Sequence, residues 1–421
     1  MPGLKKIIKV EAVVGIIGIF LLFLLVYIMT IRWPLLKNII WTGTLLRILA
    51  ALIHFFIFQL PDGKIDAVKF ENYAWSFSQM PFNEYIHSFK TNTLALTFTW
   101  VLSIIYRIFG RSPLLLQCVS IFIGVICILL VYKLSFLLGK SEKKAKQSAF
   151  IYALFPTVIL YNALILREVF VMFFLLLAFI YCVKWYHSKK INYGLMTLVC
   201  FIPLYYLHSA LVLGGLIFFL IFFKESIVFF KNRYKLNKFN IIHAILLILT
   251  PVISIYFISV LPGLKIPYLG KFDDIFTFSR ILFQTKVTNF GGSVYPDWLS
   301  PDSLTDFFLL IIPRLLYLLF SPFIWDLRAI NHLLGFVDGL LYLFLFYWIL
   351  KGMFVKKHNQ IISTLFIILI PLLIAYSWGV GNFGTALRHR VKFLPVFIAI
   401  STIYVPKITL TKKIKGFEPY E

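Results

Sequence analysis

Residues Asn38–Phe58, NIIWTGTLLRILAALIHFFIF, form an apolar run of membrane-spanning length, and Gln59–Ala74, QLPDGKIDAVKFENYA, follow it directly. The second stretch is polar and holds three acids, Asp62, Asp66 and Glu71. A helix of about 20 apolar residues crosses the hydrocarbon core of a bilayer, so these acids begin where a predicted helix leaves the membrane. A carboxylate near an apolar wall binds its proton more tightly and can serve as a general base. We therefore expect chemistry at this exit, with the remaining helices as its scaffold.

The composition is that of a membrane protein. Of the 421 residues, 61% are hydrophobic and only 14% are charged, whereas soluble domains are about 45–50% apolar and about 25% charged. Several apolar runs of spanning length, without alternation at period two, predict an all-α, polytopic helical membrane protein. We expect one integral membrane domain over residues 1–421, in the plasma (inner) membrane, and no soluble domain.

The formal net charge of +24 would favour a nucleic-acid partner in a soluble protein. Here the basic residues gather in short loops such as 139–147 and 224–238, which is the pattern of cytoplasmic loops that face anionic lipid. We therefore expect membrane lipids as partners and no nucleic acid. The four cysteines lie in apolar runs without metal-ligand spacing, so no metal site and no cofactor is predicted.

The apolar runs predict about 11–13 crossings. The expected spans are Val10–Ile31, Asn38–Phe58, Leu114–Leu138, Ser148–Leu166, Val169–Trp185, Asn192–Phe223 as a hairpin that turns near His208, Ile241–Leu261, Leu334–Leu350, Ile361–Tyr376 and Val391–Val405. Leu94–Phe109 and Phe307–Phe323 contain arginines and are expected to lie in the membrane interface. Residues 60–113 are expected to form a first outer loop with an interfacial helix, and residues 262–333 a long outer loop.

This topology brings several charged segments to one outer face: Asp66, Arg167-Glu168, His208, the long outer loop and Arg388–Arg390. It rests on the basic loops in the middle of the chain, which are assigned to the cytoplasm. It also places Lys5–Lys9 on the outer side, against the positive-inside rule. An extra crossing, or a first helix that does not span, would remove that conflict.

Asp66 is the leading candidate for a catalytic base, and Asp62 is the second. Asp62 precedes Gly63 and is typical of a turn, whereas Asp66 begins AVKFENYA, in which Ala67, Phe70 and Ala74 recur at helical spacing. An acid at a helix N-terminus is also a common capping residue. The alternative for both acids is therefore a structural role in a solvated loop.

Charged residues at the predicted spans are the next candidates. Arg167 and Glu168 separate two apolar runs, and they are expected either to anchor the helices at the membrane surface or to bind and orient substrate. Arg47 lies in the middle of a span, where an unpaired guanidinium costs several kcal/mol, so it should face a cavity or an acid. A structural ion pair explains Arg47 as well as a site role does.

Gly379–Arg390, GVGNFGTALRHR, is rich in glycine and then basic. On an outer loop the positive-inside rule does not explain these charges, and Arg388, His389 and Arg390 are candidates to bind a phosphate group. Arg280 from the long loop is a further candidate. His208 is expected to be a satisfied polar residue at a turn rather than a ligand.

The order of short motifs supplies a family resemblance. An apolar helix with an internal arginine is followed by DGKIDAVKFENYA, IFGRSPLLLQCVS, ALFPTVILYNALILREV, a long loop, LFSPFIWDLRA and GTALRHRVKFLPV. Between about residues 41 and 395 this order resembles the GT-C superfamily of membrane glycosyltransferases, and within it relatives of the protein mannosyltransferases and the lipid A aminoarabinose transferases. Val10–Ile31 is an additional helix, and no large soluble domain follows the last span, unlike many family members.

The resemblance implies an inverting transfer of sugar from a polyprenyl-phosphate donor to a glycan, lipid or protein acceptor at the outer face. It implies Asp66 as the base, because the family carries an acid in its first outer loop. A polymerase of lipid-linked polysaccharide repeat units is a close alternative. A glycolipid transporter or flippase is the alternative from another class, although the sequence lacks the internal repeat that many transporters have.

Overall fold

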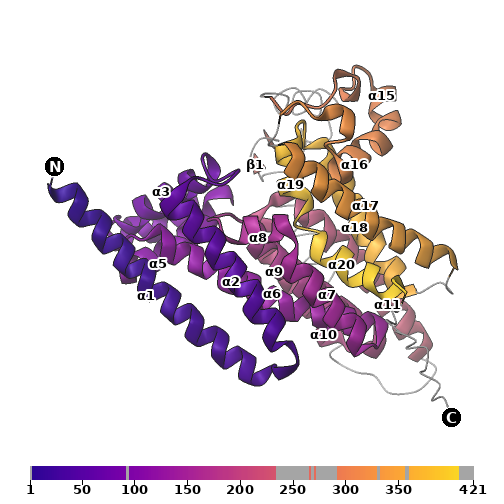
Figure 1. Cartoon of the computed structure of the whole chain (residues 1–421). Coiled ribbons are helices and arrows are strands. Elements are labelled where there is room, and N and C mark those ends of the chain that lie inside the picture. The colour runs from indigo at the N-terminus through magenta and orange to yellow at the C-terminus, as the bar shows by residue number, and fades with distance from the viewer. Residues whose placement is uncertain are drawn as a thin grey trace, which may run out of the picture.

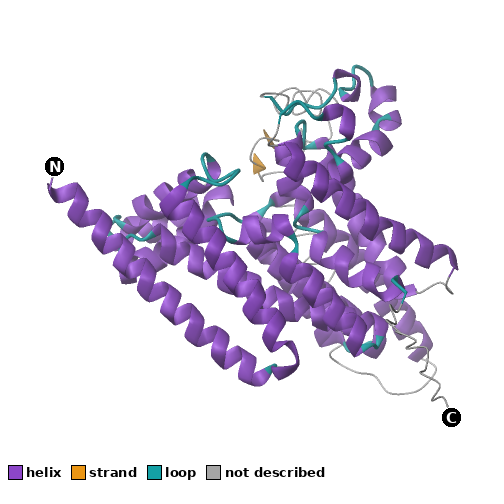
Figure 2. Cartoon of the chain, viewed as in Figure 1, coloured by secondary structure: helices purple, strands orange, loops and turns teal. Residues whose placement is uncertain are grey.

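Helices make up most of the part of the chain that the structure describes. The computed structural model describes residues 2–91, 94–233, 265–266, 270–271, 292–329, 332–355 and 360–406. Helices dominate these ranges (Figure 2), and the strands found in them, β1 (Lys265–Ile266) and β2 (Gly270–Lys271), form one short antiparallel pair. The predicted all-α class is therefore confirmed.

In residues 2–91 and 94–233 the helices follow one another with short connections (Figure 1). The α-helices are α1 (Pro2–Arg32), α2 (Lys37–Leu52), α3 (Asp66–Ser78), α4 (Phe82–Thr91), α5 (Leu94–Phe109), α6 (Pro113–Gly139), α7 (Glu142–Leu154), α8 (Pro156–Asn162), α9 (Glu168–Ser188), α10 (Ile191–Leu207), α11 (Val212–Arg233), α15 (Leu304–Leu309), α16 (Ile311–Phe320), α17 (His332–Val355), α18 (Gln360–Trp378), α19 (Phe383–Arg390) and α20 (Leu394–Tyr404). Short 3-10 or π-helical segments are η1 (Pro34–Leu36), η2 (Ile53–Ile57), η3 (Ser209–Leu211), η5 (Asp297–Leu299) and η6 (Ile324–Asp326).

Seven helices in the described ranges are long and apolar enough to cross a membrane. They are Val10–Arg32, Pro34–Ile57, Pro113–Gly139, Glu168–Ser188, Ser209–Ser226, His332–Phe354 and Gln360–Trp378. This is the architecture of a multi-pass helical membrane protein, but the count is lower than the predicted 11–13, because several expected spans are shorter helices. The expected span Ile241–Leu261 lies outside the described residues.

One expected span is broken by proline. Ser148–Leu166 is not a single helix: α7 ends at Leu154, Phe155 is extended with φ −66° and ψ 122°, and Pro156 begins α8. A residue before proline avoids the helical region, and proline itself is favoured at the first helical position. After α8 the chain is non-helical until Glu168 begins α9.

One other local prediction agrees with the structure, whereas the interfacial position of Phe307–Phe323 stays a prediction. The expected hairpin near His208 is present, because α10 ends at Leu207, His208 is extended, and α11 follows after η3. The expected interfacial segment Phe307–Phe323 consists of the short helices α15 and α16 with exposed apolar side chains, among them Phe308 and Ile312.

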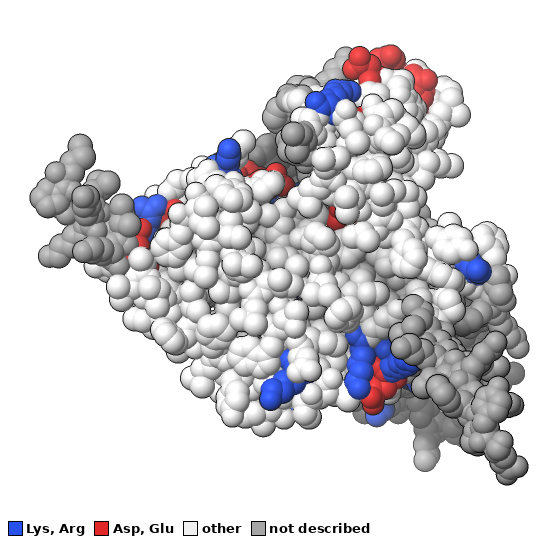
Figure 3. Space-filling model, in the orientation of Figure 1, with Lys and Arg blue, Asp and Glu red and all other residues white. Residues whose placement is uncertain are grey.

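Helices α1 and α2 form an antiparallel pair, so the N-terminus lies at the same end of the molecule as α3 (Figure 1). We call the end of the molecule that carries Asp66 the Asp66 end. In Figure 3 the broad middle of this face is almost free of charged atoms, and the lysine, arginine and acidic residues gather toward its two ends. That distribution fits a band of lipid-facing surface between two polar ends.

Helix α3, which begins with Asp66, is fastened to its neighbours by Glu71. The Tyr106 hydroxyl of α5 donates to Glu71 Oε1 at 2.9 Å, and Arg111 donates through Nε and Nη2 to the two carboxylate oxygens at 2.9 and 2.8 Å. Such bidentate, charge-assisted pairs are geometrically specific. Glu71, the third acid of the opening stretch, thus positions the helix.

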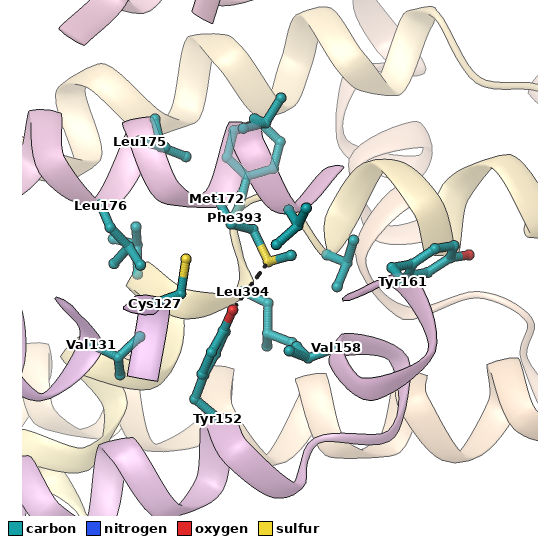
Figure 4. Close-up of a cluster of buried hydrophobic side chains, with 14 of the residues drawn as sticks. Cys127, Val131, Tyr152, Val158, Tyr161, Met172, Leu175, Leu176, Phe393 and Leu394 are labelled. Carbon is teal, nitrogen blue, oxygen red and sulfur yellow. Dashed lines mark hydrogen bonds between the residues drawn. The ribbon is translucent and has the colours of Figure 1, made fainter. Parts of the chain in front are cut away.

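A cluster of buried hydrophobic side chains joins distant parts of the chain. Tyr152 of α7, Cys127 of α6, Met172 of α9 and Phe393, just before α20, converge there, with the Tyr152 hydroxyl 3.8 Å from the Met172 sulfur (Figure 4). All four side chains are almost fully buried. This packing fixes α9 and the segment after α19 relative to each other, and both contribute charged residues to the candidate site.

Candidate functional site

Charged residues from three distant parts of the chain meet at the Asp66 end. Asp66 is the first residue of α3, Glu168 is the first residue of α9, and Arg388 lies in the last turn of α19. The side chains of Asp66 and Glu168 both accept hydrogen bonds from Arg388. An acid in the first turn of a helix is favoured by the helix dipole, which suits both carboxylates to their positions.

Arg388 bridges the two carboxylates with different nitrogens. Its Nε donates to Glu168 Oε1 at 2.7 Å, and its Nη1 donates to Asp66 Oδ2. The Glu168 side chain is only 2% exposed, whereas that of Asp66 is 41% exposed. Burial disfavours the charged form of Arg388, but the two carboxylates outweigh burial and raise the pKa of Arg388 above its ordinary value. The guanidinium therefore stays charged.

A second cation approaches the same glutamate. Lys392 Nζ lies 3.8 Å from Glu168 Oε1 and shares a 2.8 Å hydrogen bond with His389 Nδ1. It also stands over the ring of Tyr376, 5.0 Å from the centroid. Burial lowers the pKa of Lys392 well below its ordinary value, Glu168 opposes the shift, and Arg167 and Arg388 add to it. Lys392 is therefore a buried amine whose charge depends on its surroundings.

The aromatic side of this cluster contains two histidines. The ring centroid of His208 lies 5.3 Å from that of His389 and 4.7 Å from that of Tyr376. Burial, followed by repulsion from Lys392, lowers the pKa of both histidines well below the usual range. Both rings are therefore neutral near pH 7, and each offers one donor and one acceptor.

Arg167 completes the group. Its Nη1 donates to the Leu207 carbonyl at 3.0 Å, and its guanidinium lies 5.1 Å from the ring centroid of Phe70 in α3. Burial lowers the pKa of Arg167, and Glu168 opposes that shift. We call Asp66, Arg167, Glu168, Arg388, Lys392, His208, His389 and Tyr376 the Arg388 cluster.

Four buried polar atoms of the Arg388 cluster have no hydrogen-bond partner among the residues that the structure describes. They are Arg167 Nε, Glu168 Oε2, His208 Nδ1 and the Tyr376 hydroxyl. Native proteins leave few buried polar groups unsatisfied. Four of the sixteen such atoms in the described residues thus lie in this cluster, where a polar ligand or ordered water can complete their bonding.

Asp62 lies beside this cluster in a tight turn, as its sequence predicts. Its φ is +60°, the Gly63 amide donates to the Leu60 carbonyl at 3.0 Å, and the Asp62 carboxylate accepts from the Tyr161 hydroxyl at 2.7 Å. A Cβ on Gly63 would stand 2.4 Å from His54 Cε1, so the turn requires glycine. Burial raises the pKa of Asp62, while Tyr161 and Arg388 oppose the shift.

Arg390 belongs to a different environment. Its side chain is fully buried, Nε donates to Asp338 Oδ2 at 2.8 Å, and Nη1 and Nη2 donate to the carbonyls of Leu319, Ser321 and Gly335. Every guanidinium nitrogen is thus engaged inside the protein. This arrangement favours a packing role for Arg390 over the phosphate binding expected from the sequence.

Two further candidates also lie apart from the Arg388 cluster or outside the description. Arg47 is buried within α2, where Nη1 donates to the carbonyls of Gly43 and Ala153 at 2.8 and 3.0 Å. Among the described residues it has carbonyl partners and the ring of Tyr152, but no carboxylate partner. Arg280 lies outside the described residues.

Sequence reasoning overlooked Lys392 and treated His208 as an ordinary polar residue. A signal for Lys392 was present, because a lone lysine beside the apolar run Phe393–Val405 is an ionisable group at membrane depth, and such groups mark sites. Tyr161 and Tyr376 carried no comparable signal. Tyrosines are numerous in this chain, and only contacts distinguish these two.

The arrangement combines a partly exposed carboxylate with buried cations. The carboxylate of Asp66 is positioned to accept a proton, and Arg388, Arg167 and Lys392 are positioned to stabilise negative charge in a site of low dielectric. In the described part of the chain, no group of three or more His, Cys, Asp and Glu side chains could hold a metal ion. Comparisons with protein-family models, curated proteins and solved structures found no match for this chain.

Proposed function

We propose that this protein is an inverting membrane glycosyltransferase that moves a sugar from a polyprenyl-phosphate donor to an acceptor hydroxyl or amine at the outer face of the plasma membrane. One observation carries the proposal. A partly exposed aspartate and a buried set of cations share Arg388, at the end of helices long and apolar enough to span a membrane.

The proposed reaction uses the carboxylate of Asp66 and the basic side chains of the cluster. The acceptor oxygen or nitrogen attacks the anomeric carbon of the sugar and forms the new glycosidic bond. The bond between that carbon and the phosphate oxygen breaks, and polyprenyl phosphate leaves with the electron pair. Asp66 takes the proton of the acceptor, which is general-base catalysis. Arg388, Arg167 and Lys392 stabilise the negative charge that develops on the departing phosphate.

The membrane setting supports a lipid-linked donor. The Arg388 cluster lies at the ends of α9 and α18, which are both candidate spans. A polyprenyl chain in the bilayer would deliver its phosphate at this depth. The lipid phosphate then supplies the activation of the sugar, so the site needs no nucleotide-binding motif.

The proposal is tested by transfer from defined donors. The purified full chain in lipid nanodiscs is incubated with farnesyl-phosphate-linked hexoses, pentoses and N-acetylhexosamines together with hydroxyl and amine acceptors, and release of farnesyl phosphate is measured by mass spectrometry. We expect release with at least one sugar, and a fall of at least about 10²-fold in Asp66→Asn, which keeps the shape but removes the base. Glu84→Gln, an exposed acid of α4 outside the cluster, is the control.

Three results would contradict the proposal. Equal release by Asp66→Asn and the wild type would leave Asp66 without a catalytic role. Movement of intact donor across the bilayer, without cleavage of the sugar–phosphate bond, would favour a glycolipid transporter instead. The release of a product with several joined repeat units would instead identify a polymerase.

A further inference from the structure

The two bonds of Arg388 are unequal. The bond from Nε goes to Glu168, whose side chain is 2% exposed, and the bond from Nη1 goes to Asp66, whose side chain is 41% exposed. Breaking a buried ion pair is strongly destabilising because it leaves a charge buried without its partner, whereas an exposed pair contributes little. Asp66 is therefore the partner that Arg388 can exchange, and Glu168 is the permanent one.

One guanidinium nitrogen of Arg388 remains available. Its side chain is 13% exposed, and among the residues that the structure describes its Nη2 has no hydrogen-bond partner. Nη1 and Nη2 form one edge of the planar guanidinium, and this edge matches two oxygens of a phosphate group. A phosphate that binds this edge takes the place of Asp66 Oδ2 and leaves the Nε bond to Glu168 intact.

In the structure, one oxygen of the Asp66 carboxylate is engaged by Arg388. Oδ2 accepts the Arg388 hydrogen bond, so this oxygen faces a cation rather than an incoming acceptor. Release from Arg388 would make that oxygen available. The same event that binds an anion would therefore prepare the base.

We propose that the Asp66–Arg388 ion pair is a latch, which the phosphate of the bound donor opens by taking over Arg388 and thereby freeing Asp66 to accept the acceptor's proton. This inference rests on the proposed function and adds an order of events to it. The donor binds first, the latch opens, and only then is the acceptor deprotonated. An acceptor that enters the empty site meets a carboxylate already engaged by Arg388.

The latch predicts an effect that a simple base would not produce. If Asp66 competes with phosphate for Arg388, removal of its carboxylate should improve phosphate binding while abolishing transfer. We expect the affinity of Asp66→Asn for farnesyl phosphate to rise about tenfold, which corresponds to about 1.4 kcal/mol. Asp66→Ala, a second variant without the carboxylate, should behave in the same way.

The experiment measures binding of farnesyl phosphate to the full chain in detergent by isothermal titration calorimetry at pH 7.5. Asp62→Asn is the matched control, because Asp62 is a neighbouring carboxylate that accepts from Tyr161 rather than from Arg388. We expect its affinity to change much less than that of Asp66→Asn. Thermal unfolding of each variant establishes that the fold is retained.

The outcomes separate the latch from the proposed function. Unchanged or weaker binding by both Asp66→Asn and Asp66→Ala, with saturable binding by the wild type, would overturn the latch and leave the phosphate site standing. Equal tightening in Asp62→Asn would also overturn it, since any lost negative charge would then suffice. No saturable binding by the wild type or by any variant would overturn the phosphate site and with it the proposed donor.

Discussion

Arg388 and Arg390 stand two residues apart on α19, yet they serve different regions of the molecule. Arg388 lies between a partly exposed aspartate and a buried glutamate, beside buried polar atoms that lack partners. Arg390 is enclosed with Asp338 of α17, which also accepts from Thr157 of α8 at 2.6 Å, and its remaining donors meet carbonyls. Arg388 is partly exposed and keeps one nitrogen without a partner among the described residues. Arg390 is fully buried, and all its guanidinium nitrogens donate hydrogen bonds.

The difference shows how to separate a site from a structural ion pair in a membrane protein. Both arginines are paired with acids, so pairing by itself does not distinguish them. The bonding of each guanidinium does: every nitrogen of Arg390 donates inside the protein, whereas Nη2 of Arg388 has no partner among the described residues. Gly339 supports this assignment, since a Cβ there would stand 2.2 Å from the Phe320 carbonyl oxygen, and the close approach of α16 and α17 helps to seal Arg390.

The largest expected effect concerns the sealed pair. Asp338→Ala would leave the charge of Arg390 buried without its acid, and we expect the free energy of unfolding to fall by about 3–5 kcal/mol. Unfolding in mixed micelles by increasing SDS measures this change. Asp66→Ala is the control, because its pair with Arg388 is partly exposed and should contribute less than about 1 kcal/mol. Equal losses in the two variants would erase the proposed contrast between the regions.

A smaller effect is expected when Arg388 is replaced by lysine. Arg388→Lys keeps the charge, but one ammonium group cannot reproduce the planar fork that joins Glu168 to Asp66 or to a phosphate. We expect affinity for farnesyl phosphate to fall about tenfold with the fold retained. In Arg390→Lys the loss should appear in stability and not in the affinity of the folded protein. The reverse pattern would assign the phosphate to Arg390.

The smallest expected effect is a pH dependence of folding stability that arises from Asp62. Burial raises the folded-state pKa of this carboxyl above the unfolded value of 3.8, so the folded protein holds the proton more tightly. The resulting contribution favours folding below about pH 4 and is lost as pH rises through the folded pKa. Asp62→Asn should therefore gain stability relative to the wild type between pH 4 and pH 7, as measured by thermal unfolding. A constant difference across that range would contradict the shift.

Local features of the chain were predictable from its sequence. The apolar runs located most of the long helices, the extended residue His208 ended α10, and Asp66 began α3. Where prediction failed, the cause was also local, since Pro156 interrupts a run that hydropathy alone reads as one span. These features depend on a few neighbouring residues, and hydrophobicity, proline and helix capping act at that range.

The pairing within the site depended on the tertiary structure. Asp66 and Arg388 are 322 positions apart, and Glu168 and Arg388 are 220 positions apart, so no local pattern links them. The periodicity of a helix explains the contrast between the two arginines. Successive residues turn by about 100°, so Arg388 and Arg390 face nearly opposite sides of α19, and Lys392, four residues after Arg388, reaches the same glutamate.

The amino-acid sequence alone therefore determined that this is an all-helical chain with membrane-spanning segments and an acid at the start of α3, because hydrophobic length and helix signals are local properties. It could not determine which side of α19 would face the Asp66 end, nor that Lys392 and Tyr376 would join Arg388 there. Those choices follow from the packing of α19 and α20 against α9, α16 and α17, and they depend on the shapes of many distant side chains together.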